Sequence, residues 1–320
     1  MKALITGGAG FIGSHLSEKL LDRNDEVFVL DDISTGSPDN IRQLQNNHKF
    51  HLCVGSVLNA SLVAQLISQS DIIFHLAASV GVKLIVEDPI NTLNTNILGT
   101  KIILDEASRQ KKPVVFASTS EVYGKNNKVP FREDDDIVMG SPAILRWGYA
   151  CSKAAGECLA VSFNKKAGLP VIIIRLFNTI GPRQTDKYGM VVPRFIKQAL
   201  AGEPLTVFEK GRQSRCFTFV DDVVKAIIDL SAKKQAYGQI YNIGNNEETS
   251  ILDLAKKVIK ITDSKSIIDF IPYNEAYSEG FEDMPQRMPD ISKIHKLTGY
   301  RPETSLDKAL GITIDYFRKN

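Results

Sequence analysis

The sequence predicts an α/β fold, with a doubly wound parallel sheet and a smaller, discontinuous α/β lobe. Apolar, strand-like runs alternate with segments of helical periodicity through residues 1–175, which is the pattern of parallel strands joined by crossover helices. After residue 175 this alternation loosens and the polar loops lengthen. We therefore expect one domain over residues 1–175 and a substrate lobe mainly over 176–320, with elements near 216–243 returning to the first domain.

The individual elements are assigned from apolar runs and from helical spacing. The expected strands of the first half span residues 3–5, 27–31, 50–54, 71–76, 113–117 and 170–175. The expected helices of this half span residues 14–21, 92–109 and 150–167. In the second half we expect helices over 192–201, 220–231 and 251–261, a strand over 239–243 and a loop-rich stretch over 272–289.

A glycine-rich turn joins the first expected strand to the first expected helix. Gly7, Gly10 and Gly13 follow the apolar run directly. Glycines at this place let the backbone turn sharply and let a pyrophosphate approach it. The N-terminus of the helix then offers free N–H groups and the positive end of its dipole to the phosphates. The turn therefore predicts a Rossmann-type dinucleotide site.

An acidic residue, Asp31, ends the second expected strand, 18 residues after Gly13. A carboxylate at about this distance holds the ribose hydroxyl groups of the adenosine in dinucleotide sites. Asp32 follows it, and no Lys or Arg occurs until Arg42, so the sequence offers no obvious partner for a 2′-phosphate. We expect NAD rather than NADP as the cofactor.

The composition argues against several classes of function. The chain has 39 Lys and Arg against 37 Asp and Glu, a net charge of +2, which provides no basic surface for nucleic acid or for a membrane. Its four cysteines have neither metal-ligand nor disulfide-framework spacing. No signal peptide precedes the first strand, and no apolar run approaches membrane-spanning length. We expect a cytoplasmic protein that binds no metal, nucleic acid or membrane.

Polar residues with catalytic potential follow the fifth expected strand. Ser118, Thr119 and Glu121 come directly after it, and ligands of open α/β sheets bind beyond the carboxyl ends of the strands. Tyr149 and Lys153 are four residues apart at the start of a helix, so they share one face. A nearby ammonium favours phenolate and lowers the pKa of a tyrosine from about 10. Tyr149 is therefore the candidate base, and Ser118 or Thr119 the candidate donor to an alkoxide.

Six motifs of the chain occur together in one known family. They are Gly7-Gly-Ala-Gly-Phe-Ile-Gly13, His75-Leu-Ala-Ala78, Asn94-Thr-Asn-Ile-Leu-Gly-Thr100, Ser118-Thr-Ser-Glu-Val-Tyr-Gly124, Tyr149-Ala-Cys-Ser-Lys153 and Arg175-Leu-Phe-Asn-Thr-Ile-Gly-Pro-Arg183. With them the chain resembles, along nearly its whole length, the extended short-chain dehydrogenase/reductase family of nucleotide-sugar epimerases, dehydratases and decarboxylases. Ser56 departs from the pattern, because the family usually has an aspartate there near the adenine.

The resemblance implies an NAD-dependent enzyme that transiently oxidises a nucleotide-linked sugar at C4. Tyr149 would remove the proton of the 4-hydroxyl while hydride goes to NAD⁺, and Lys153 would hold the nicotinamide ribose and lower the pKa of Tyr149. Further cofactor contacts are implied for Phe11, Ile12, Ala77 and Asn96. Contacts to a nucleotide-diphosphate sugar, expected to be UDP-linked, are implied for Asn178, Val191, Arg215 and Arg287, and arginine suits phosphate because its fork of donors binds two oxygens at once.

Three outcomes are open for the resulting 4-ketone. Return of hydride to the other face of the sugar makes a 4-epimerase, loss of CO₂ from a C6 carboxylate makes a decarboxylase, and loss of water from C6 makes a 4,6-dehydratase. Glu121 bears on the choice, because elimination needs a base for the C5 proton and epimerisation does not. The stretch 118–124 resembles both UDP-glucuronate decarboxylases and GDP-mannose dehydratases. The Arg146-Trp147 pair before Tyr149 and the stretch 279–290 resemble UDP-glucuronate decarboxylases.

Other stretches keep the alternatives open. Residues 188–194 and 216–221 are similar to many 4-epimerases. We rank UDP-glucuronate decarboxylase first, UDP-sugar 4-epimerase second and 4,6-dehydratase third. A non-catalytic sensor that only binds NAD is disfavoured, because Tyr149 and Lys153 occur together with Thr119 and Glu121.

The resemblance also implies a homodimer. Its interface would be a four-helix bundle made by the helices over 92–109 and 150–167 of both copies. Ile102, Leu159 and Phe163 are the candidate contact residues. The nucleotide base, the sugar and the pathway stay open at this point.

Overall fold

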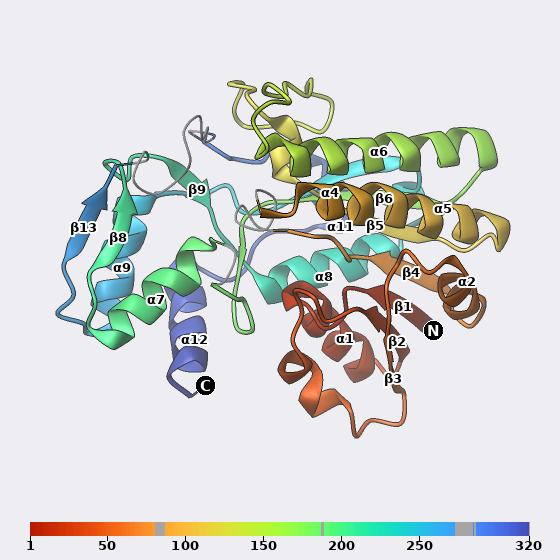
Figure 1. Cartoon of the computed structure of the whole chain (residues 1–320), viewed down its shortest axis with the longest axis horizontal. Helices are drawn as coiled ribbons and strands as arrows, with labels where there is room; N and C mark the ends of the chain where they lie inside the picture. Colours follow the sequence, from red (N-terminus) through yellow and green to blue (C-terminus); the bar gives the residue numbers. More distant parts are fainter. Residues whose placement is uncertain (81–86, 187–188, 273–283, 285, 320) are drawn as a thin grey trace.

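A parallel sheet of seven strands lies at the centre of the molecule, in the order β11-β6-β5-β4-β1-β2-β3 (Figure 1). The strands are β1 (Lys2–Thr6), β2 (Glu26–Asp31), β3 (Phe50–Val54), β4 (Ile72–His75), β5 (Val114–Thr119), β6 (Val171–Leu176) and β11 (Gln239–Ile243). The strand order reverses between β1 and β4, and the crevice at such a point is where α/β sheets bind ligands. The predicted α/β class with a Rossmann-type sheet is confirmed.

The computed structural model describes residues 1–80, 87–186, 189–272, 284 and 286–319. Most of the expected loop over 272–289, and parts of the stretches 188–194 and 279–290, lie outside the described residues.

Helices cover both faces of the sheet, in three layers (Figure 1). Helices α1 (Phe11–Asp22) and α8 (Val220–Ser231) pack together on one face. Helices α2 (Ala60–Ser68), α5 (Thr100–Arg109) and α6 (Trp147–Ala167) pack on the other. Successive side chains of each strand enter opposite cores, so both faces are apolar, as a doubly covered parallel sheet requires.

The helix expected over residues 92–109 is divided in the structure. It consists of α4 (Pro89–Leu93), a π-helical turn η2 (Asn94–Gly99) and α5. Such π-helical turns are rare and occur frequently at functional sites. Periodicity alone did not predict it, because the apolar spacing on either side of the turn remains helical.

The second lobe is built around a two-stranded parallel sheet of β8 (Leu205–Phe208) and β13 (Ile268–Ile271). Helices α7 (Val191–Ala201), α9 (Ile251–Thr262) and α12 (Leu306–Lys319) pack together next to this sheet. The smaller elements are η1 (Pro38–Leu44), η3 (Ser120–Tyr123), β7 (Thr179–Ile180), β9 (Ser214–Cys216), β10 (Thr218–Phe219), η4 (Lys234–Ala236), β12 (Glu248–Ser250) and α11 (Ser292–Thr298).

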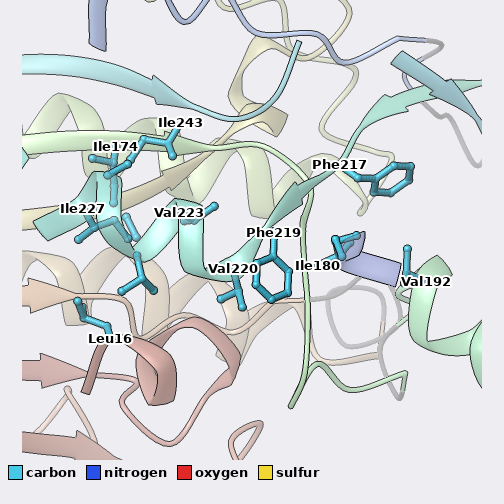
Figure 2. Packing of buried hydrophobic residues seen from close by; sticks show 14 of the residues in the cluster. Leu16, Ile174, Ile180, Val192, Phe217, Phe219, Val220, Val223, Ile227 and Ile243 are labelled. Atoms are coloured by element: carbon cyan, nitrogen blue, oxygen red, sulfur yellow. The ribbon is translucent and has the colours of Figure 1, made fainter. Parts of the chain in front are cut away.

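One apolar core joins the sheet to the second lobe. Figure 2 shows Leu16 of α1, Ile174 of β6 and Ile227 of α8 in the same cluster as Val192 of α7 and Phe217. Strand β11, which lies between β8 and α9 of this lobe in the sequence, pairs with β6 at the edge of the main sheet. The two parts therefore share buried side chains, and the domain boundary near residue 175 stays a prediction.

Candidate active site

A cleft with a volume of about 470 Å³ opens at the carboxyl ends of the central strands and continues along the second lobe. Sixteen of the seventeen residues predicted from the sequence line it. They are Gly7, Gly10, Phe11, Ile12, Gly13, Asp31, Ala77, Ser118, Thr119, Glu121, Tyr149, Lys153, Asn178, Val191, Arg215 and Arg287. The remaining one, Asn96, is not among the lining residues.

The glycine turn forms one end of the cleft. Gly7 has a φ of +75°, and a Cβ atom on it would lie 2.7 Å from the backbone nitrogen of Ala77. A Cβ atom on Gly13 would lie 2.2 Å from the carbonyl oxygen of Gly7. Gly10 is the N-cap of α1 and makes no side-chain cap, so the first N–H groups of the helix are available to an anion. The turn fits a pyrophosphate.

Asp31 is fixed at the end of β2 beside this turn. Its carboxylate accepts backbone hydrogen bonds from Ala9 at 2.9 Å and from Ile33 at 2.8 Å. Burial raises the pKa of Asp31 above its usual range. Each carboxylate oxygen has a second lone pair for a ribose hydroxyl. The lining residues next to it in the sequence, Asp32, Ser34 and Thr35, include no cation.

Tyr149 and Lys153 lie on the first turns of α6 and face the middle of the cleft. Tyr149 is hydrogen-bonded with Thr119. Burial and the negative charge of Glu121 raise the pKa of Tyr149 above 10. This differs from the lowering expected from Lys153, because sequence spacing does not show how completely a phenol is buried. Burial lowers the pKa of Lys153 itself to about 8.

The Ser118 side chain is hydrogen-bonded behind the part of the cleft that Thr119 and Tyr149 line. Its hydroxyl donates a hydrogen bond of 2.5 Å to Oε1 of Glu157, and the side chain is 3% exposed. Glu157 also accepts two bonds from Arg175. Thr119 is therefore the better placed of the two hydroxyls to assist Tyr149. Sequence reasoning missed Glu157, although its position one turn after Lys153 was a usable signal.

Asn96 acts from behind the cleft wall. Its side-chain oxygen accepts a hydrogen bond from the backbone N–H of Ser79 at 2.9 Å, and its nitrogen donates to the Ser79 carbonyl and to Ser152 Oγ. Ser79 lines the cleft, whereas Asn96 is 1% exposed. The π-helical turn places the Asn96 amide behind the segment that carries Ser79, and the cofactor contact expected for Asn96 stays a prediction.

Two arginines flank Glu121 in the part of the cleft that Thr119 and Tyr149 line. Arg287 Nη1 lies 3.2 Å from Glu121 Oε1, and Arg146 Nη1 lies 3.9 Å from Glu121 Oε2. The first of these contacts places the Arg287 guanidinium beside Glu121, and the substrate contact expected for Arg287 stays a prediction. Arg146 was noticed in the sequence only as part of a motif and was not predicted as a site residue.

The second lobe supplies the far wall of the cleft. The Asn178 side-chain nitrogen is buried and has no hydrogen-bond partner among the described residues, so it can donate to a ligand. Arg215 of β9 lines the same cleft. Arg194 lies with its guanidinium 4.5 Å from the ring centroid of Phe208, and both residues were missed by sequence reasoning. Arginines and an aromatic ring at this wall suit a nucleoside diphosphate.

Two features are absent from the described part of the chain. No group of three or more His, Cys, Asp or Glu residues lies close enough together there to hold a metal ion. None of the helices over the same residues has both the length and the apolar character needed to cross a membrane.

Comparison with known proteins relates this cleft to nucleotide-sugar enzymes. Residues 4–313 match the family model described as GDP-mannose 4,6 dehydratase. The chain is 42% identical over 319 residues to UDP-N-acetyl-alpha-D-glucosaminuronate decarboxylase of Bacillus cytotoxicus, covering 99% of this chain and 98% of that protein. It is 37% identical to UDP-glucuronic acid decarboxylase 1 of Danio rerio, covering 99% of this chain and 73% of that protein.

Solved structures show the same fold. UDP-glucuronic acid 4-epimerase from Bacillus cereus, in complex with UDP-glucuronic acid and NAD, is 32% identical and superposes with a TM-score of 0.90 over 100% of this chain and 99% of its own. UDP-glucose 4-epimerase from Thermotoga maritima is 30% identical, with a TM-score of 0.90 and the same coverage.

Proposed function

The chain belongs to the GDP-mannose 4,6-dehydratase family of extended short-chain dehydrogenases/reductases, and from this premise we propose that it is an NAD-dependent decarboxylase of a UDP-linked uronate. The substrate class is either UDP-glucuronate or its 2-acetamido analogue, since relatives that act on each are similar over nearly the whole chain. The two share the C6 carboxylate on which the reaction depends.

The observation that carries this proposal is the contact between Glu121 and Arg287 beside Tyr149. Epimerisation of a neutral sugar at C4 needs a base and a hydride acceptor only. Removal of a C6 carboxylate in addition calls for a cation to orient the carboxylate and an acid or base near C5. Glu121 and Arg287 are groups of these kinds, and both affect the pKa of Tyr149 through their charges.

The residues of the cleft fit NAD. The glycine turn admits a pyrophosphate only because no Cβ atom fills it, and Asp31 is held where a ribose would lie. When bound, NAD⁺ supplies the hydride acceptor for C4 and a positive charge near Tyr149. Lys153, which is buried and lies one turn after Tyr149 on α6, would bind the ribose next to the nicotinamide.

Proton transfer at O4 is the first task of the protein groups. Tyr149 accepts the proton of the 4-hydroxyl, and the hydrogen bond with Thr119 stabilises its anion. The C4 ketone is then β to the C6 carboxylate. The C5–C6 bond breaks, CO₂ leaves, and the electron pair is delocalised onto O4, where Thr119 and protonated Tyr149 can donate hydrogen bonds. C5 then takes up a proton in place of the lost CO₂, from the side of Glu121 and Arg287.

Proton NMR of the purified protein with NAD⁺ tests the proposal. The panel contains UDP-glucuronate, UDP-N-acetylglucosaminuronate, UDP-glucose and GDP-mannose. A UDP-pentose or UDP-4-keto-pentose formed together with CO₂ from either uronate supports the decarboxylase. A mixture of C4 epimers at constant mass makes the protein an epimerase, and a 4-keto-6-deoxy sugar from a neutral substrate makes it a dehydratase.

A second candidate is a UDP-uronate 4-epimerase. The similarity to the Bacillus cereus epimerase favours it, because that protein binds a uronate and NAD. Decarboxylation stays first, because the curated relatives with that activity are more similar in sequence.

We further propose a cytoplasmic homodimer formed through α5 and α6. Ile102, Leu159 and Phe163 are only partly buried against the core beneath these helices, which leaves apolar surface for a second copy. Light scattering after gel filtration measures the mass, and a monomer would contradict the dimer. Fractionation of the cells that make the protein tests its location.

A further inference from the structure

His75, the last residue of β4, has no task in the reaction described above. It is 1% exposed, and both of its ring nitrogens are hydrogen-bonded. Nδ1 lies 2.7 Å from the hydroxyl oxygen of Thr6, the last residue of β1. Nε2 lies 3.1 Å from the hydroxyl oxygen of Thr100, the first residue of α5. One buried ring therefore joins the strand before the glycine turn to the helix after the π-helical turn.

The direction of each hydrogen bond follows from neighbouring groups that can only donate or only accept. The Thr100 hydroxyl donates its single hydrogen to the carbonyl oxygen of Asn96 at 2.6 Å, so it accepts from His75 Nε2–H. In the neutral ring, Nδ1 then carries a lone pair and accepts from the Thr6 hydroxyl. The Thr6 oxygen in turn accepts from the backbone N–H of Ala77 at 3.2 Å. The chain of hydrogen bonds thus runs in one direction from Ala77 to Asn96.

The surroundings of the ring keep it neutral. Burial and the charge of the nearby Lys153 lower the pKa of His75 to about 3. The rings of His75 and Phe116 are stacked with their centroids 5.8 Å apart, and the Lys153 ammonium lies 4.6 Å from the centroid of the same Phe116 ring. A histidine that stays neutral does not exchange protons near neutral pH. Its function is therefore to connect its two partners.

The Thr6 end of this chain belongs to the segments that fit NAD. Thr6 directly precedes Gly7, the first residue of the glycine turn. A Cβ atom on Gly7 would lie 2.7 Å from the backbone nitrogen of Ala77, which is the nitrogen that donates to Thr6. Gly7 and Ala77 both line the cleft. The bond to His75 therefore orients the hydroxyl that joins the end of β1 to Ala77.

The Thr100 end of the chain leads to the helix that carries Tyr149 and Lys153. Thr100 binds the carbonyl group of Asn96 in the π-helical turn. The Asn96 side chain donates to Ser152 Oγ at 3.0 Å, and Ser152 donates to the Tyr149 carbonyl at 2.7 Å. Asn96, Thr100 and Ser152 are at most 1% exposed, and hydrogen bonds are stronger in such a dry interior than in water.

We propose that His75 is a positioning residue, which fixes the NAD-binding ends of β1 and β4 relative to Tyr149 and Lys153 on α6. Such a role matters for hydride transfer, because a misplacement of about 1 Å can reduce a rate about 100-fold. The step concerned is the oxidation at C4, which all three candidate reactions share. The inference rests on the proposed function only in requiring that oxidation.

Two replacements break the chain on different sides of His75. His75→Asn places an amide near Nδ1, where it can accept from Thr6 but cannot reach Thr100, and His75→Gln places an amide near Nε2, where it can donate to Thr100 but cannot accept from Thr6. Fluorescence titration measures the affinity for NAD⁺. His75→Gln should weaken NAD⁺ binding by about 10-fold, the scale of one buried hydrogen bond. His75→Asn should change it by less than about twofold, because the bond to Thr6 is kept.

The hydride step is measured per NAD-loaded site. Extraction gives the amount of bound NAD, and UDP-glucuronate with hydrogen or deuterium at C4 gives kcat per loaded site and its isotope effect. Both variants should lower this kcat by about 10- to 100-fold, with a primary isotope effect because hydride transfer then limits turnover. The exposed His48→Gln is the matched control and should change neither quantity.

Normalising to bound NAD separates positioning from stability. A purely structural role would reduce the amount of folded, NAD-loaded protein and leave the rate per loaded site unchanged. A near-normal rate per loaded site in either variant therefore overturns the proposal, and so does a lower rate without an isotope effect. If neither variant folds, Thr100→Val decides by the same two measurements, because it breaks the chain between His75 and Asn96 without changing the ring.

The outcome is independent of the reaction that follows oxidation. C4 epimers at constant mass, in place of CO₂, reject the decarboxylase, and the isotope effect is then measured on the epimer with the C4-deuterated form of the sugar that reacts. Release of CO₂, together with a near-normal rate per loaded site in the variants, rejects this inference and retains the decarboxylase.

Discussion

Arg175 of β6 and Glu157 of α6 form a bidentate ion pair beneath the cleft, with Nε–Oε1 and Nη2–Oε2 distances of 2.9 Å and 2.7 Å. Both side chains are at most 5% exposed. Glu157 also accepts the hydrogen bond of Ser118 from the end of β5. One carboxylate therefore fixes two neighbouring strands to the helix that carries Tyr149 and Lys153.

We expect Glu157→Gln to lower the free energy of unfolding by about 3 kcal/mol, because removal of one partner leaves a buried charge unpaired. Glu303→Gln is the matched control, since Glu303 pairs with Lys225 on the surface, and it should lower the free energy of unfolding far less than Glu157→Gln does. Urea denaturation of both variants measures the difference. Equal effects would show that the buried pair contributes no more than a surface one.

We expect Lys153→Met to stabilise the protein near neutral pH while it abolishes turnover. Burial lowers the pKa of Lys153 from 10.5 to about 8, so the folded state binds its proton less tightly than the unfolded state does. The free energy of unfolding therefore rises with pH between about 8 and 10.5 and is reduced as pH falls through about 8. Removing the ammonium should recover on the order of 3 kcal/mol at about pH 7.

The pH dependence provides the control for this variant. Denaturant titrations at about pH 7 and about pH 10 should show the advantage of Lys153→Met shrinking as pH rises. At the higher pH Lys153 is neutral in the folded state, so no charge is buried, and the unfolded state is close to its pKa of 10.5 and releases the proton at little cost. An advantage that is constant with pH would mean that packing, rather than charge burial, explains the stabilisation.

We expect Tyr149→Phe to reduce turnover by about 10²- to 10⁴-fold, the usual contribution of a general base. Stability should change little, because the hydroxyl is hydrogen-bonded only with Thr119 among the groups that affect its pKa. Release of CO₂ from UDP-glucuronate measures turnover, and thermal unfolding monitors the fold. A folded variant with a near-normal rate would require a different base.

We expect Glu121→Gln to separate oxidation from the later steps. Oxidation at C4 uses Tyr149 and should persist, whereas proton transfer at C5 should slow about 100-fold. The near-ultraviolet absorbance of reduced nicotinamide should therefore accumulate when UDP-glucuronate is added. Nearly unchanged turnover, with interconversion of C4 epimers, would instead identify an epimerase.

We expect Gly13→Ala to abolish NAD binding, because its Cβ atom would lie 2.2 Å from the carbonyl oxygen of Gly7. Gly311→Ala is the matched control, since nothing lies within 4 Å of a Cβ atom at that helical position. It should leave NAD binding intact and stabilise the protein by up to about 1 kcal/mol. Fluorescence titration with NAD⁺ compares the two, and similar affinities would place the pyrophosphate elsewhere.

The sequence was sufficient to predict those features that depend on the spacing of nearby residues. The strand over 50–54 was predicted to the residue, because four of its five residues are apolar and a lysine and a glycine border it. The glycine turn and the Tyr149–Lys153 pair were predicted because each depends on the spacing of residues that are close in the sequence. The pairs Glu157–Arg175 and Glu121–Arg287 were not, because residues 18 and 166 positions apart leave no periodic signal.

Besides contacts between distant residues, the sequence did not show how deeply each side chain of the site is buried. Spacing alone suggested that Lys153 lowers the pKa of Tyr149, whereas complete burial of the phenol dominates in the folded chain. Spacing also suggested that Ser118 and Thr119 are equivalent donors. Only the structure shows that Ser118 is held by Glu157.

The late return of β11 to the main sheet has a consequence for synthesis on the ribosome. Once residue 176 has been made, six of the seven sheet strands exist, and β6 is an open edge whose partner is still untranslated. Its backbone groups and its isoleucines, Ile172 to Ile174, stay unpaired on that side while the intervening residues are added, which takes several seconds at about 5–20 residues per second. The nascent chain is thus most exposed to misassociation before residue 243 leaves the exit tunnel.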